Sequence, residues 1–171
     1  MSNIEKQAEL ATNIKLSFRQ RIDYSISEFG YNSIYYWISA FMAVFLTDQM
    51  GIAAGAVSFL TLFVRIFDGI NDPIIGSMAD RSVDKGKGKY KPWVCWGALA
   101  MSLSIIALFA MQASWSYTFK MIYMWVTYLL VTIFSTCCNM PFGALNGVLT
   151  SDSGERAKLS GLRMVFANVG A

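Results

Sequence analysis

The sequence has no histidine and few charged residues, and these absences exclude several classes of protein. Charged residues make up 15% of the 171 residues, whereas soluble domains carry about 25%. The absence of histidine removes the commonest catalytic base and metal ligand. The three cysteines lie in apolar segments without CxxC or zinc-type spacing, so we interpret them as buried thiols: Cys95, Cys137 and Cys138. An integral-membrane enzyme therefore has little support.

Hydrophobic residues dominate the sequence instead. They make up 55% of the chain, and the mean hydropathy is +0.43. We predict an all-α protein with polytopic transmembrane helices at about 29–46, 55–79, 93–111 and 119–142, and a fifth helix that starts near residue 159. The fifth has about 13 residues, whereas a crossing needs about 20. We expect a polar N-terminal segment over 1–27 and a membrane-helical part over 28–171 that is truncated within the fifth span, so that the 171 residues are the front of a larger protein.

Basic residues predict the orientation of these spans. The N-terminal segment has four, the 80–92 loop five and the 150–158 loop two. The turns at 47–54 and 112–118 have none. The positive-inside rule therefore predicts a cytoplasmic N-terminus in an inner or plasma membrane. The 80–92 loop is too short for a nucleic-acid partner and lacks the spacing of a phosphate-binding loop.

Three charged residues interrupt the second apolar segment. Arg65, Asp68 and Asp72 are spaced i, i+3, i+7 and share one helical face. Such residues are costly in a bilayer and mark an ion or substrate pathway by default. Two carboxylates one turn apart, with the amide oxygen of Asn71, can hold a sodium ion or share a proton. Alternatively, Asp68 pairs with Arg65, and Asp72 caps a new helix that begins at Pro73.

Other polar groups in the spans have two interpretations each. Asn139 beside Pro141, with Thr136 one turn earlier, predicts either a cavity lining or a kink stabilised by helix–helix hydrogen bonds. Arg163 either extends toward the cytoplasmic interface or binds a ligand. Tyr31 and Asn32 belong to an aromatic first span that faces lipid or stacks on a sugar.

A longer string of motifs resembles one known family. It comprises DGINDPIIG at 68–76, Asp80-Arg81, GKYKPW at 88–93, FLTD at 45–48 and NMPF at 139–142. Together these resemble the glycoside–pentoside–hexuronide:cation symporters of the major facilitator superfamily. The resemblance covers residues 25 to 171.

The resemblance implies roles for particular residues. It implies a cation site of Asp68, Asn71, Asp72 and Thr136, a substrate site of Tyr31, Asn32, Asn139 and Arg163, and a conformational loop with Asp80, Arg81, Lys89 and Lys91. The coupling ion would be Na⁺ or H⁺, with no other cofactor, and the partners would be a sugar or glycoside, the lipid bilayer and the C-terminal helices of the transporter.

The sequence departs from the family in two ways. Asn32 and Asn139 stand where the melibiose carrier has sugar-binding aspartates, and Tyr31 stands where it has a lysine, so its α-galactoside specificity does not carry over. Members of the family also have twelve spans in two six-helix halves, and alternating access needs both halves. The resemblance therefore leaves two hypotheses. The chain is the N-terminal part of a cation-coupled sugar symporter, or it is a truncated membrane protein that does not transport or a half-size subunit that needs a partner.

Overall fold

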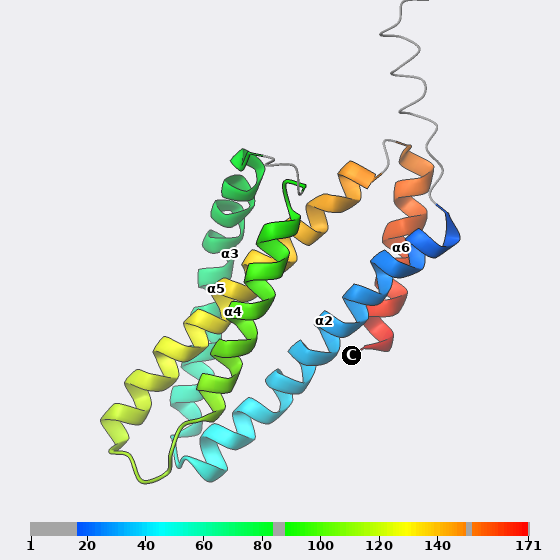
Figure 1. Cartoon of the computed structure of the whole chain (residues 1–171). Coiled ribbons are helices and arrows are strands. Elements are labelled where there is room, and N and C mark those ends of the chain that lie inside the picture. Colours follow the sequence, from blue (N-terminus) through cyan, green and yellow to red (C-terminus); the bar gives the residue numbers. More distant parts are fainter. Residues whose placement is uncertain (1–16, 84–87, 150–151, 171) are drawn as a thin grey trace, which may run out of the picture. The chain divides into compact units, whose positions relative to one another are not determined.

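A computed structural model describes residues 17–83, 88–149 and 152–170, which are helical with short connections. The helices are α2 (Phe18–Val44), a short π-helix η1 (Phe45–Gln49), α3 (Ala54–Arg81), α4 (Lys91–Phe109), α5 (Tyr117–Leu149) and α6 (Ser153–Val169), shown in Figure 1. The predicted all-α class is confirmed. Residues 1–16 of the predicted N-terminal segment, Lys85 and Lys87 of the basic loop, and the start of the 150–158 loop lie outside the described residues.

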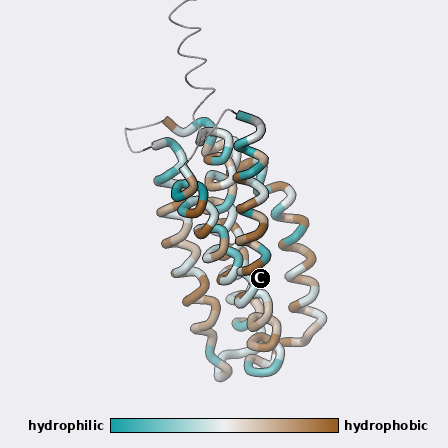
Figure 2. The backbone as a smooth tube through the Cα atoms, turned by 90° about the vertical axis from the view of Figure 1, so that its right-hand side faces the viewer, coloured by the Kyte–Doolittle hydropathy of each residue, from teal (hydrophilic) through white to brown (hydrophobic). Residues whose placement is uncertain are grey.

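Three helices in the described part of the chain are long and apolar enough to cross a bilayer: α3, α4 and α5. They coincide with the predicted second, third and fourth spans. The predicted first span falls within α2 and η1, and the predicted fifth falls within α6, whose 17 residues end at Val169. Figure 2 shows hydrophobic residues distributed along the helices, as expected for a protein whose solvent is largely lipid.

Two prolines lie inside unbroken helices. The alternative of a new helix that begins at Pro73 is wrong, because α3 continues through this proline from Ala54 to Arg81. Pro141 likewise lies inside α5. Membrane helices tolerate proline where neighbouring groups satisfy the freed backbone carbonyl. Asp72 is therefore inside a helix, and its alternative role as a helix cap is excluded.

The chain divides into two compact units, 41–143 and a second made of 1–40 and 144–171. The first unit has an apolar core that includes Leu46, Leu60, Leu108 and Met124, each fully buried. Within it, α4 and α5 approach closely at Gly97, and the Tyr123 hydroxyl donates to the Ala107 carbonyl at 2.7 Å.

The other unit is held together by polar contacts between α2 and α6. Arg21 forms an ion pair with Glu155, and Arg163 forms one with Glu28. Asn146 of α5 donates a hydrogen bond to the Ser160 hydroxyl at 2.8 Å. In the first pair α2 supplies the basic residue, and in the second pair α2 supplies the acidic one. This reversed arrangement fixes the register of the two helices.

Candidate cation and substrate sites

Two residues predicted for the cation site meet across α3 and α5. The Thr136 hydroxyl donates to Asp72 Oδ1 at 3.0 Å, although 64 residues separate them in sequence. The same hydroxyl lies 3.2 Å from the Thr132 carbonyl, so its single proton is shared between the two acceptors. Thr136 is buried and Asp72 is half-buried. Asp72 is thus positioned by its own helix and by α5.

The other two predicted cation ligands have buried polar atoms without partners. Asp68 Oδ1 and Asn71 Nδ2 are inaccessible and form no hydrogen bond with the described residues. A buried polar group without a partner costs free energy, which a bound ion would offset. Rotation of the Asn71 amide by a half-turn exchanges Nδ2 with Oδ1, and the oxygen is a ligand that sodium accepts.

The pairing of Asp68 with Arg65 is not supported by the geometry. Arg65 is exposed, and no ion pair within 4.0 Å joins it to Asp68, although both are described residues. Within the described ranges, no group of three or more His, Cys, Asp or Glu residues could hold a metal ion.

Glu28 joins two residues predicted for the substrate site. Arg163 approaches it with Nη2 3.1 Å from Oε1 and Nε 2.9 Å from Oε2. Asn32, one turn along α2, donates through Nδ2 to the Glu28 carbonyl at 2.9 Å, and this nitrogen lies 3.4 Å from Oε1. Arg163 therefore points across to α2, and does not extend away to the interface as the alternative required.

Glu28 is the functional candidate that the sequence reasoning missed. The predicted first span began at residue 29, just after Glu28, whereas α2 begins at Phe18 and includes Glu28. The signal was present, because Glu28 precedes Asn32 by four residues and shares its helical face.

The remaining two predicted substrate residues, Tyr31 and Asn139, belong to different units of the chain. Tyr31 stacks on Tyr35, with ring centroids 6.3 Å apart and planes 15° from parallel. Asn139 is half-buried on α5 and belongs to the 41–143 unit, next but one to the buried Pro141. Its part in a common substrate site therefore stays a prediction.

The predicted conformational loop is anchored by a tyrosine. The Tyr90 hydroxyl donates to Asp80 Oδ1 at 2.7 Å, and the Lys89 ammonium lies 5.2 Å from the centre of the Tyr90 ring. The hydrogen bond to the Asp80 carboxylate raises the pKa of Tyr90. Arg81 and Lys91 are exposed. The ends of the loop are thus tied together through Asp80 and Tyr90.

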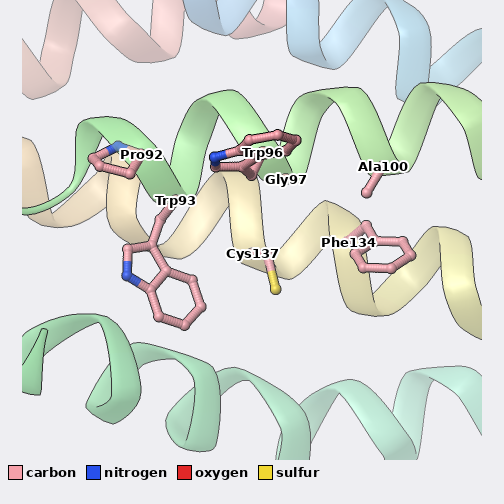
Figure 3. A pocket seen from close by; sticks show the side chains of 7 residues that line it. All are labelled: Pro92, Trp93, Trp96, Gly97, Ala100, Phe134 and Cys137. Atoms are coloured by element: carbon pink, nitrogen blue, oxygen red, sulfur yellow. The ribbon is translucent and has the colours of Figure 1, made fainter.

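A pocket of about 350 Å³ lies elsewhere, on α4 and α5. Figure 3 shows its lining, which is almost wholly apolar: Pro92, Trp93, Trp96, Gly97, Ala100, Phe134 and Cys137. It contains none of the residues predicted for cation or substrate. A sugar needs several hydrogen-bonding groups in its site, so this pocket does not suit one.

Known proteins with sequences similar to this chain are named as symporters and transporters. A family model described as MFS/sugar transport protein matches residues 24–171. The inner membrane symporter YicJ of Escherichia coli is 36% identical over 91% of this chain and 33% of its own length. The uncharacterized symporter YnaJ of Bacillus subtilis is 33% identical over 94% and 35%. The isoprimeverose transporter of Lactiplantibacillus pentosus is 31% identical over 89% and 31%. The chain thus spans about a third of the length of these relatives.

Proposed function

Because the chain belongs to the MFS/sugar transport protein family, we propose that it supplies the N-terminal helices of a cation-coupled sugar symporter. Its resemblance to the glycoside–pentoside–hexuronide:cation symporters is confirmed by the family match and by relatives named as symporters and sugar transporters. It is a multi-pass membrane protein from a family of transporters, and not an enzyme. The substrate is a sugar, glycoside or hexuronide, and the remaining partners are the bilayer and the C-terminal helices.

The observation that carries the proposal is the Thr136–Asp72 hydrogen bond beside the unpartnered Asp68 and Asn71 atoms. It supports a cation site to which α3 contributes Asp68, Asn71 and Asp72 and α5 contributes Thr136. Sodium or a proton neutralises the Asp68/Asp72 pair, and this favours sugar binding. Because such coupling is reciprocal, the sugar tightens cation binding by the same factor.

The test uses the intact gene product in membrane vesicles. Uptake of a panel of radiolabelled glycosides and glucuronides is measured with an imposed sodium or proton gradient, and without one. Asp72→Asn removes one ionisable ligand and should abolish the stimulation of uptake by the cation. The control is Asp48→Asn, which removes an exposed carboxylate of η1 and should leave the stimulation intact.

Two results would contradict the proposal. Persistent cation stimulation in Asp72→Asn would show that the site assignment is wrong. If the wild-type protein takes up no glycoside under either gradient, the proposed function itself is wrong.

A further inference from the structure

Glu28 is a buried carboxylate on a helix of a membrane protein. The residue is 7% exposed. We propose that Glu28 is a sugar-binding residue, whose carboxylate accepts a hydrogen bond from a substrate hydroxyl beside Asn32 and Arg163. This inference rests on the proposed function, because it names a residue of the proposed sugar site.

Glu28 lies between two predicted substrate residues. Its carboxylate contacts the Arg163 guanidinium twice, at 3.1 and 2.9 Å, and lies 3.4 Å from the Asn32 amide. The three side chains therefore form one cluster on facing parts of α2 and α6. A carboxylate, a guanidinium and an amide together offer both donors and acceptors, as recognition of several hydroxyls requires.

The Glu28 carboxylate keeps capacity to accept further hydrogen bonds. Oε2 is 2.9 Å from Arg163 Nε, yet it accepts no hydrogen bond of regular geometry from the residues described. An ionised carboxylate has about four acceptor positions. The Glu28 side chain keeps 10% of its surface exposed and Arg163 keeps 23%, so a ligand can reach the edge of the pair.

The Glu28 carboxylate is a stronger hydrogen-bond acceptor than the neighbouring Asn32 amide. Asn32 is neutral, and hydrogen bonds to a charged acceptor are about twice as strong as neutral ones. Glu28, one turn before Asn32, supplies an anionic acceptor to the same helical face. Replacing a buried ion pair by apolar residues is often neutral or stabilising, so stability alone is a weak reason for a charged pair here.

The chain offers a matched control for a purely structural role. Arg21 and Glu155 form a second ion pair between α2 and α6, in which Glu155 also contacts Lys158 at 3.2 Å. Glu155 is 4% exposed. Glu155→Gln therefore makes the same chemical change at the same helix pair, but away from Asn32 and Arg163.

The experiment measures uptake by the intact gene product in membrane vesicles, for the best glycoside of the panel and each of its monodeoxy analogues. We expect Glu28→Gln to weaken the apparent affinity for the parent glycoside at least tenfold. One deoxy analogue, which lacks the hydroxyl that Glu28 binds, should have nearly equal affinity for the wild type and Glu28→Gln. Glu28→Asp should recover part of the affinity, and Glu155→Gln should leave it unchanged.

Three outcomes separate the hypotheses. If Glu28→Gln weakens the parent and every analogue by one factor, or if Glu155→Gln has the same effect, Glu28 only holds α2 to α6 and the inference is overturned. The same conclusion follows if Glu28→Gln leaves sugar affinity unchanged. If the wild type takes up no glycoside under either cation gradient, the proposed function fails first. Binding of the coupling cation to Glu28→Gln, measured in the absence of sugar, checks that the variant is folded. It should equal that of the wild type, because the substitution leaves the cation site unchanged.

Discussion

At the scale of single residues, the Thr136 hydroxyl holds one carboxylate of the proposed cation site. It donates to Asp72 Oδ1, and its own position is fixed by the contact with the Thr132 carbonyl. A hydrogen bond to a charged group is worth about 1.5–3 kcal/mol. This contact therefore positions the Asp72 carboxylate within the proposed cation site.

Thr136→Val keeps the shape of the side chain and removes this hydrogen bond. We expect the half-saturating concentration of the coupling cation for sugar uptake to rise roughly tenfold, since 1.4 kcal/mol corresponds to a factor of ten. The maximal rate at a saturating concentration of the cation should change little. Thr136→Ser should behave as the wild type.

The matched control for Thr136 lies on the same helix. Thr127 is also buried, and its hydroxyl bonds to the backbone carbonyls of Tyr123 and Met124. Thr127→Val should leave the cation dependence unchanged. An equal effect of both valine substitutions would mean that α5 was disturbed in general, and Thr136 would lose its assigned role.

Single-residue contacts were only partly predictable from sequence. Asp68, Asn71 and Asp72 share a helical face by spacing, which local geometry decides. The contact of Asp72 with Thr136 depends on packing between distant helices, and here the family resemblance supplied the pairing. Glu28 was missed because a helix boundary inferred from hydropathy excluded it, and boundaries are the least certain part of such inferences.

At the scale of helices, Gly97 lets α4 approach α5. A Cβ atom placed there would lie 2.9 Å from the Cys138 nitrogen and 3.0 Å from the Cys137 carbonyl carbon. Both are backbone atoms of α5, so they cannot turn aside as a side-chain tip would. Small residues at such crossings are typical of membrane helices, whose association depends on close packing.

Gly97→Ala should therefore separate the two helices and lower the free energy of unfolding by about 1–3 kcal/mol. Gly76→Ala is the control, because no atom lies within 4 Å of its added Cβ in this structure and alanine favours helix. Unfolding is measured by titration with a denaturing detergent. Equal stability of Gly97→Ala and Gly76→Ala would show that α4 and α5 are not in close contact at this position.

Helix continuity at Pro73 was the element-scale feature that the sequence left open. A new helix that begins at Pro73 was one alternative, because in water a proline inside a helix costs about 3 kcal/mol. In a bilayer the alternatives to helix leave backbone groups unsatisfied, and this cost exceeds that of one lost hydrogen bond. The all-α class was nonetheless predictable, since long apolar segments cannot cross a membrane as isolated strands.

At the scale of the whole molecule, the proposed mechanism depends on orientation in the membrane. The basic residues gather on alternate connections, with Lys89 and Lys91 before α4 and none between residues 112 and 118. The positive-inside rule assigns the loop between α3 and α4 to the cytoplasm and the turn at 112–118 to the opposite side. The length of α4, 19 residues from Lys91 to Phe109, is enough to separate them by one crossing.

Cysteine labelling tests this orientation. In a background in which Cys95, Cys137 and Cys138 are replaced by alanine, Ser114→Cys and Lys91→Cys each introduce one exposed thiol. A membrane-impermeant maleimide added to intact cells should label the Ser114→Cys variant at once and the Lys91→Cys variant only after permeabilisation. The reverse pattern would invert the chain in the membrane. The Asp80–Tyr90 contact would then lie on the outer side, and the loop between α3 and α4 could not act as a cytoplasmic conformational element.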